Sequence, residues 1–322
     1  MSSQRVHASE RTAWIAAPAG VVYGLLADAV RWPLLLPSPV HVERIDFDGV
    51  RERLRLWDVA GERVRSFHLR RMLHPGSRTV EFEQEDTVRP GAPTTGTWTV
   101  EARGDAESLV TLRQEHTVEA LPAAATARSR QEWEAEQAAQ LAHLKAAAER
   151  WERLDELLLS FEDSVHVDGP AELVYDFLHH IEDWPERIPH VESVSVVEDV
   201  PGVQVAAVDT CATPDGRTAA TRAVRLCFPS AARIVFKELV TPEPIAAHTG
   251  EWSLIPEGDG VRVVCARQVM LRDEAARQVP GTATGLVEAR RYVRTWLGRA
   301  STETLRLAKW RAQTTTTVRR LR

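Results

Sequence analysis

The sequence predicts an α+β protein of two tandem domains, each a curved antiparallel sheet wrapped around a long C-terminal helix with a cavity between them. Three observations support this prediction: the chain length, an internal repeat, and the order of segments within each repeat. A chain of 322 residues is about twice the length of a typical compact domain. Its composition, 43% hydrophobic and 27% charged, is that of a globular chain. Length alone therefore favours two domains.

An internal repeat identifies the two domains as copies of one another. At an offset of 152, Pro18, Tyr23, Trp32, Pro33 and Pro37 recur as Pro170, Tyr175, Trp184, Pro185 and Pro189. At an offset of 154, Arg63, Arg71, Pro75, Gly96, Trp98, Arg113 and Gln114 recur as Arg217, Arg225, Pro229, Gly250, Trp252, Arg267 and Gln268. The join lies near residue 160, so we expect domains at 1–159 and 160–312 and a frayed tail at 313–322.

Each repeat begins with a short strand and a helix. Residues 11–15 and 164–167 are strand-like, and the prolines that follow, Pro18 and Pro170, suit the first turn of a helix, where a missing N–H costs nothing. Apolar residues at spacings of three and four continue each helix. We expect the helices to end near the Trp-Pro pairs, because the residue before a proline disfavours helical geometry.

A meander of antiparallel strands and a long helix complete each repeat. Segments 64–73, 79–85, 96–102, 109–115 and 262–270 alternate or are rich in β-branched residues, with glycine-containing turns between them. Apolar stripes at helical spacing then run from Trp133 to Leu158 and from Leu286 to Ala308. This order of elements cannot form a parallel sheet, so the sheet is expected to curl around the long helix and leave a cavity.

Four features point to a known family: the Ala17–Pro33 opening, the strand Val64–Arg71, the strand Glu81–Glu85 and the tandem arrangement itself. With these features the repeats resemble the helix-grip domains of the StAR-related lipid-transfer and Bet v 1 type. The whole chain resembles the didomain aromatase/cyclases of bacterial type II polyketide synthases. The resemblance implies an enzyme, a polyketide cyclase/dehydratase without a cofactor. It would close by aldol chemistry, and then dehydrate and aromatise, the first ring of a poly-β-ketone that is tethered to an acyl carrier protein and already reduced at one ketone.

The resemblance also implies where the site lies. In the family, the strand near position 70 usually reads Trp-x-Ser-x-Arg, and here Phe67, Leu69 and Arg71 take those places, so the arginine is kept and the serine hydroxyl is not. Trp32 falls at a pocket tryptophan, and Gln84 falls where some single-domain relatives carry a second arginine. The family's pocket tyrosine is replaced in the two halves by Pro39 and Val191.

Strand geometry and side-chain chemistry specify the role that the resemblance implies for Arg71; without the resemblance, an arginine on a strand is more often a solvated surface group. A period of two places Phe67, Leu69 and Arg71 on one face of their strand and His68 on the other. Arginine stays protonated, so Arg71 is not a general base, but it can hold a carbonyl or a developing enolate oxygen. We therefore expect Arg71 to be catalytic, with ordered water carrying protons. The expected substrate-binding residues are Trp32, Phe67, Leu69, Gln84, Trp98, Trp184 and Arg225.

Alternative functions and roles stay open at this stage. The chain could instead be a non-catalytic carrier or chaperone of a hydrophobic small molecule; inward-facing Arg71 and Arg225 favour chemistry, and a wholly apolar lining favours carriage. One pocket could be active and the other structural. Trp32 and Trp184 could simply fasten the end of the helix.

Charge and composition exclude several other classes. A net charge of −6 and a pI near 6.0 argue against a nucleic-acid partner. The odd set Cys211, Cys227 and Cys265 contains no C-x-x-C pair, so we expect neither disulfides nor a zinc site and predict a cytoplasmic location. The most apolar stretch, 21–40, carries charged residues and prolines and cannot span a membrane. No phosphate-loop, nucleophile-elbow or zinc-protease motif is present, and no bound metal is expected.

Overall fold

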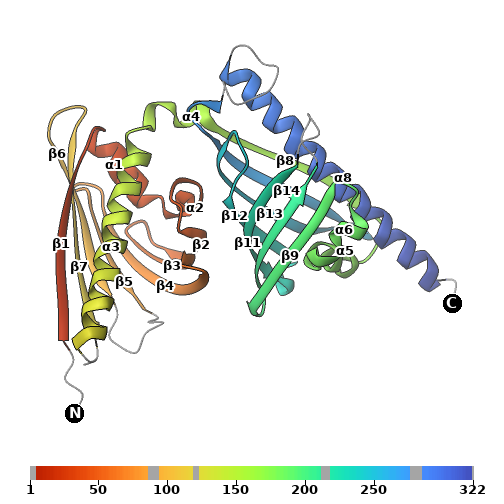
Figure 1. The fold of residues 1–322 in the computed structure, drawn as a ribbon, viewed down its shortest axis with the longest axis horizontal. Helices are drawn as coiled ribbons and strands as arrows, with labels where there is room; N and C mark the ends of the chain where they lie inside the picture. The colour runs from red at the N-terminus through yellow and green to blue at the C-terminus, as the bar shows by residue number, and fades with distance from the viewer. Residues whose placement is uncertain (1–4, 86–93, 119–122, 212–217, 276–284, 321–322) are drawn as a thin grey trace. The chain divides into compact units, whose positions relative to one another are not determined.

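The chain forms two compact units that divide between Arg153 and Leu154, a few residues before the predicted join (Figure 1). The computed structural model describes residues 5–85, 94–118, 123–211, 218–275 and 285–320. In these residues each unit contains one seven-stranded antiparallel sheet and a long helix that follows it in the chain. The predicted α+β architecture of two copies is confirmed.

The N-terminal unit orders its strands β1-β7-β6-β5-β4-β3-β2. The strands are β1 (Arg5–Ile15), β2 (Pro39–Phe47), β3 (Arg51–Ala60), β4 (Arg63–His74), β5 (Thr79–Gln84), β6 (Thr95–Ala102) and β7 (Ser108–Val118). The helices are α1 (Ala19–Ala27), α2 (Trp32–Leu35) and α3 (Ala123–Ala148). Helix α3 runs beside β1, as Figure 1 shows.

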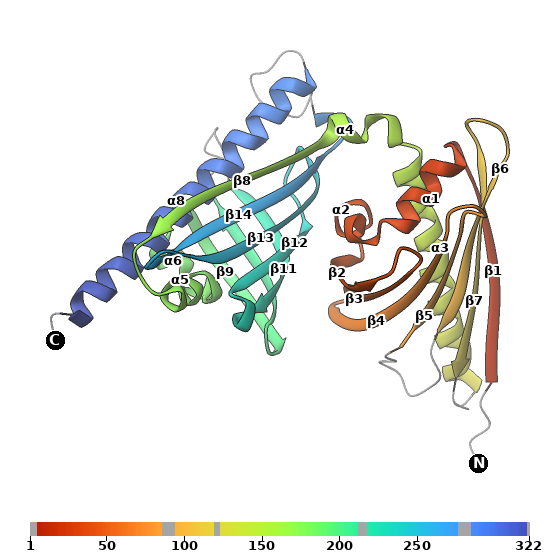
Figure 2. The ribbon, with the colours of Figure 1, turned by 180° about the vertical axis from the view of Figure 1, so that it is seen from behind.

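The C-terminal unit repeats this order as β8-β14-β13-β12-β11-β10-β9. Its strands are β8 (Leu158–Val167), β9 (Val191–Val200), β10 (Val203–Thr210), β11 (Ala219–Phe228), β12 (Arg233–Val240), β13 (Ile245–Glu257) and β14 (Gly260–Leu271). Its helices are α4 (Leu154–Leu157), α5 (Ala171–His179), α6 (Trp184–Arg187) and α8 (Leu286–Arg320). Helix α8 runs along β8 and β14 (Figure 2).

The proline signals define the short helices. Pro18 and Pro170 occupy the N-cap positions of α1 and α5, as expected for residues whose fixed φ suits a helix start. Helix α1 ends at Ala27, earlier than predicted, and Trp32 begins a separate helix with Pro33 in its first turn. The Trp-Pro pair therefore starts a helix here and does not end one.

The long helices differ from the predicted stripes at their C-terminal ends. Helix α3 stops at Ala148, and Trp151, which was expected on the stripe, is 38% exposed. Leu158 belongs to β8, where it lies opposite Met270, so strand pairing overrides the helical spacing there. Helix α8 instead continues through residues 313–320, where a tail was predicted, and its Gln313 donates to Asp168.

Each core lies between the inner face of a sheet and the helices. In the N-terminal unit Val80, Val100 and Leu112 pack in one cluster with Leu141 and Leu144 of α3. In the C-terminal unit Ile234, Trp252 and Leu254 pack in one cluster with Leu305 and Ala308 of α8. In the part of the chain that the structure describes, no helix combines the length and apolar character needed to cross a membrane.

Candidate functional site

A row of inward-facing residues crosses the N-terminal sheet at the level of Arg71. Each residue lies directly opposite the next on the neighbouring strand, in the order Glu52, Arg71, Phe82, Gly96, Gln114 and Ser9. Phe67, Leu69 and Arg71 share this face, being 9%, 8% and 3% exposed, while Arg70 is exposed. The assignment of the strand's two faces from sequence therefore holds.

Arg71 joins the sheet to the end of helix α1. Its Nη2 donates to the carbonyl oxygens of Leu26 at 2.6 Å and Ala27 at 3.3 Å, the last carbonyls of that helix. A cation at a helix C-terminus is favourable because the helix dipole places partial negative charge there. Nη1 lies 3.4 Å from Oε1 of Glu52, and the guanidinium lies 5.0 Å from the Trp32 ring centre.

Part of the Arg71 guanidinium is left without a hydrogen bond. Nε and Nη1 are buried and find no hydrogen-bond partner among the described residues, and neither does the buried hydroxyl of Tyr23 on α1. Burial lowers the pKa of Arg71 to about 10, although the Glu52 carboxylate opposes this shift. Burial also raises the pKa of Tyr23, so both groups carry their protons at neutral pH. An unsatisfied buried donor costs about 1–3 kcal/mol, which makes these groups candidates for binding a ligand oxygen.

The structure brings three of the predicted binding residues close to Arg71. Phe67, Leu69 and the half-buried Trp32 pack in one apolar cluster, together with Phe82. Trp32 Nε1 donates to the Leu25 carbonyl at 2.9 Å, so this tryptophan also fastens α2 to α1, as one of the alternatives proposed.

The other two predicted residues of this unit lie on either side of the row, each two residues along its strand from a member of the row. Gln84 is opposite Leu69 on β5 and is half-buried. Trp98 is opposite Leu112 on β6 and packs against the cluster that contains Leu141. They belong to the same inner face of the sheet but not to the cluster that holds Trp32.

The C-terminal unit repeats the arginine with different partners. Arg225 is 4% exposed and donates from Nη2 to the Leu178 carbonyl and from Nη1 to the His179 carbonyl and to Oε1 of Gln204. Its guanidinium lies 5.7 Å from the ring centre of Trp184, whose Nε1 donates to the Phe177 carbonyl at 3.0 Å. Burial lowers the pKa of Arg225 as well. Both of its terminal nitrogens are therefore occupied, which is not true of Arg71.

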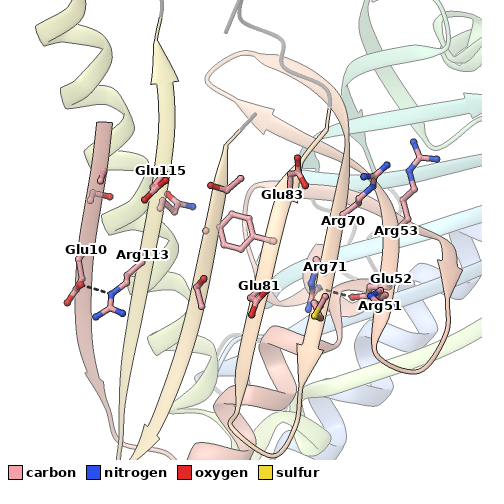
Figure 3. Close-up of a pocket in the computed structure, with 18 of the residues that line it drawn as sticks. Glu10, Arg51, Glu52, Arg53, Arg70, Arg71, Glu81, Glu83, Arg113 and Glu115 are labelled. Carbon is pink, nitrogen blue, oxygen red and sulfur yellow. Dashed lines mark hydrogen bonds and ion pairs between the residues drawn. The ribbon is translucent and has the colours of Figure 1, made fainter. Parts of the chain in front are cut away.

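A separate hollow of about 1100 Å³ lies on the N-terminal sheet. Its lining includes eight charged residues that lie one position along from the inward row, and they are Glu10, Arg51, Arg53, Arg70, Glu81, Glu83, Arg113 and Glu115 (Figure 3). Its lining also includes all six residues of the inward row, Arg71 and Glu52 among them, but not Trp32, Phe67 or Leu69. The hollow therefore belongs mainly to the opposite face of the sheet from the predicted site.

Sequence reasoning missed two residues of the site, Glu52 and Tyr23. Glu52 precedes Leu54 and Leu56 at a spacing of two, and an acidic residue on an otherwise apolar strand face is the signal that could have identified it. Tyr23 was noticed as part of the repeat but not as a site residue. No group of three or more His, Cys, Asp or Glu side chains is arranged to hold a metal within the described ranges.

Comparison with known proteins connects this geometry to a family. The family model described as "Polyketide cyclase / dehydrase and lipid transport" matches residues 167–291. A granaticin polyketide synthase bifunctional cyclase/dehydratase of Streptomyces violaceoruber is 33% identical over 97% of this chain and 96% of that protein. An actinorhodin polyketide synthase bifunctional cyclase/dehydratase of Streptomyces coelicolor is 34% identical over 96% of this chain and 98% of that protein.

The two-unit architecture is also found among solved structures. The di-domain ARO/CYC BexL from the BE-7585A biosynthetic pathway matches with a TM-score of 0.83 and 35% identity, over 95% of this chain and 98% of that one. The similarity spans both units and is not limited to a single copy of the fold.

Proposed function

This chain belongs to the family of polyketide synthase bifunctional cyclase/dehydratases, and from that premise we propose that Arg71 binds the reacting oxygen of its substrate. The protein is a polyketide aromatase/cyclase, which closes a ring of a poly-β-ketone by aldol chemistry and dehydrates it. The observation that carries the proposal for Arg71 is its pair of buried nitrogens, Nε and Nη1, which lack hydrogen-bond partners.

The chemistry of aldol closure explains why such an arginine is useful. An acidic methylene must approach a distant carbonyl, and negative charge develops on that carbonyl oxygen as the new C–C bond forms. Fixed donors that point at this oxygen stabilise the charge without reorganisation. The carbonyls of Leu26 and Ala27 hold the guanidinium in place through Nη2, so Nε and Nη1 are oriented before the substrate arrives.

The surrounding side chains suit a folded polyketide. Phe67 and Leu69 provide an apolar wall, and Trp32 stacks near the guanidinium. Tyr23 adds a protonated hydroxyl, because burial raises its pKa. It lies near Arg71 and Glu52, whose charges both influence that pKa. We assign Arg71 the polarising role, and Trp32, Phe67 and Leu69 the role of shaping the chain, with Gln84 and Trp98 further along the wall.

The partner in this scheme is an acyl carrier protein that delivers the tethered chain. Membership in a polyketide synthase family supports a tethered intermediate, because such chains grow on a carrier. The cytoplasm remains the compartment predicted from the cysteines. We expect the substrate to carry one reduced ketone before the first ring closes.

Reconstitution of the pathway tests the proposal. A minimal synthase and a ketoreductase are incubated with and without this protein, and the products are identified by mass spectrometry and NMR. Wild-type protein should convert shunt products into a compound with an aromatic first ring. Arg71→Gln should leave the shunt products in place; ring closure at the wild-type rate in that variant would remove Arg71 from the mechanism. Unchanged products with wild-type protein would favour a carrier of hydrophobic molecules.

A further inference from the structure

A chain of polar side chains crosses the interior of the C-terminal unit, apart from Arg225. His248 Nδ1 on β13 lies 2.8 Å from Oε1 of Glu238 on β12, and His248 Nε2 lies 3.0 Å from Nη1 of Arg267 on β14. Arg267 Nε donates to the hydroxyl of Ser301 on α8 at 2.9 Å. Three strands and the long helix thus each contribute one group to a continuous contact chain.

The donor and acceptor roles in this chain follow from arginine chemistry. A guanidinium only donates, so His248 Nε2 must accept from Arg267, and the ring proton sits on Nδ1 facing Glu238. His248 thus holds Nε2 toward Arg267, while its Nδ1 lies close to the Glu238 carboxylate without the alignment of a hydrogen bond. This is the general arrangement of an oriented base.

The N-terminal unit carries different residues at the equivalent positions. Sheet register identifies the equivalent positions, because Gly96 lies opposite Gln114 and Gly250 lies opposite Arg267. The positions equivalent to Glu238, His248 and Arg267 carry Gln84, Thr94 and Gln114. Gln114 accepts from Gln137 of α3, which in turn accepts from Ser9, so that interior carries a neutral chain.

Glu238 and Arg267, the charged neighbours of His248, are partly exposed to solvent. His248 and Ser301 are fully buried, but the Glu238 side chain is 14% exposed and Arg267 is half-buried. The Arg267 guanidinium lies 5.4 Å from the Phe236 ring centre. Arg267, next to the Phe236 ring, is therefore an end of the chain that solvent reaches.

We propose that Glu238, His248 and Arg267 form a second reaction site, in which the C-terminal unit dehydrates the β-hydroxyketone that ring closure produces. The proposal rests on the proposed function, because aldol closure supplies this substrate. It assigns different steps to the two units and gives a chemical reason why both are present in one chain.

The step balances without any further reagent. The ketone oxygen takes over the Arg267 N–H that His248 accepted, which frees the Nε2 lone pair. Nε2 then removes the proton from the carbon between the ketone and the hydroxyl-bearing carbon, and the electron pair moves onto the oxygen held by Arg267. The enolate collapses to form the C=C bond, and the C–O bond breaks. The departing hydroxide takes the proton back from Nε2 and leaves as water.

Glu238 and Ser301 are positioning residues in this scheme. The Glu238 carboxylate, 2.8 Å from His248 Nδ1, favours the tautomer that carries its proton there, and Ser301 fixes Arg267 from the side of α8. Glu238→Gln should reduce kcat for dehydration and leave KM almost unchanged, because the carboxylate acts through His248 and not on the substrate. Glu238→Asp should restore part of the loss.

A direct assay uses full-length protein and a synthetic cyclic β-hydroxyketone, with water loss followed by absorbance as the conjugated enone forms. His248→Gln keeps an acceptor for Arg267 but cannot carry a proton, and Arg267→Gln installs the residue of the N-terminal unit. Each should slow dehydration by about 100-fold, the usual scale for losing a general acid–base group. His166→Gln, the same substitution at an exposed histidine of this unit, serves as the control and should match wild type.

The outcomes separate this proposal from the role of Arg71. Arg71→Gln should fail to close rings in the reconstituted pathway, whereas the His166→Gln control should both close rings and dehydrate the synthetic ketone at the wild-type rate. His248→Gln should close rings there and, at early times, accumulate the cyclic β-hydroxyketone that has not yet lost water. Wild-type dehydration rates in folded His248→Gln and Arg267→Gln would overturn the second site, whatever Arg71 does. If His248→Gln does not fold, Arg267→Gln and Glu238→Gln decide the matter.

Discussion

In the N-terminal unit the residue opposite the buried arginine is Glu52, and in the C-terminal unit it is Gln204. Both arginines bind the last carbonyls of a short helix and lie near a tryptophan that fastens the next helix. Arg71 has two nitrogens without hydrogen bonds, whereas both terminal nitrogens of Arg225 donate. The shared contacts hold the short helices on the sheets, and the differing ones are the basis of the different roles proposed for the two copies.

The comparison extends along the same row of the sheet. Gln114 in the first unit corresponds to Arg267 in the second, which contacts His248. One interior thus combines an arginine that has two nitrogens without hydrogen bonds with a neutral chain through Gln114, and the other combines an arginine whose terminal nitrogens both donate with a charged chain through Arg267. Two copies of a domain with the same function would not require different polar residues at these positions.

The largest expected effect separates Arg71 from Arg225. Arg71→Gln should lower the rate of ring closure by about 100-fold or more, as for loss of a main donor to a developing oxyanion. Arg225→Gln should have a much smaller effect on closure, because its nitrogens already have partners. Rates from the reconstituted pathway, with circular dichroism as the folding control, check this. An equal loss of ring-closure rate in Arg71→Gln and Arg225→Gln would contradict the different roles assigned to the two arginines.

The next effect concerns stability. Glu52→Gln gives the N-terminal unit the residue type of Gln204 and removes the carboxylate that faces buried Arg71 and that accepts from Arg44. We expect the free energy of unfolding to fall by about 3 kcal/mol, since breaking a buried ion pair leaves a charge uncompensated. Urea denaturation measures it. A variant as stable as wild type would show that the neutral arrangement serves both units equally.

A smaller effect should be equal in the two units. Trp32→Phe and Trp184→Phe each remove an indole N–H that donates to a helix carbonyl. Each should cost about 1 kcal/mol of stability, the usual net value of one hydrogen bond. Thermal unfolding of the pair gives the comparison. A clear difference between them would mean that one tryptophan has a role beyond fastening the helix.

The smallest effect is on the alkaline side of the pH profile. Burial lowers the pKa of Arg71 to about 10, and Glu52 raises it in opposition. The guanidinium is charged below that pH and loses its proton above it, so the rate of ring closure should fall as the pH rises through about 10. Removing the Glu52 carboxylate lowers the pKa further, and the fall should then begin closer to neutrality. A profile that does not move would separate Glu52 from Arg71 electrostatically.

The sequence predicts the fold better than it predicts the site. Tandem repeats, prolines at helix starts and strand alternation identify both sheets and place Arg71 on the inner face. Helical spacing from Trp133 to Leu158 fails at the end of α3, because Leu158 pairs with β14 and spacing carries no information about strand partners. Which backbone carbonyls Arg71 contacts depends on how α1 lies on the sheet, and no local pattern encodes that.

Alignment of the repeats also misses a register difference. The constant offset of 154 equates Arg113 with Arg267, but the sheet places Gln114 in the position of Arg267. The hairpin from Gly250 to its partner Arg267 is one residue shorter than the hairpin from Gly96 to its partner Gln114, so the residues of β14 are displaced by one position from the constant offset. A one-residue shift exchanges the two faces of a strand, and this is why the interior Arg267 is visible only in three dimensions.

Binding of a substrate oxygen by the unpaired nitrogens of Arg71 can be observed directly. Protein labelled with 15N-arginine is titrated with a β-diketone mimic of the substrate, and the Nε–H resonances are followed by NMR, with Arg71→Lys and Arg225→Lys used for assignment. The account predicts that the Arg71 Nε–H signal moves as a new hydrogen bond forms. Arg71→Gln, the variant expected to lose ring closure, should also bind the β-diketone more weakly. A saturating ligand that leaves the Arg71 signal unmoved would contradict it.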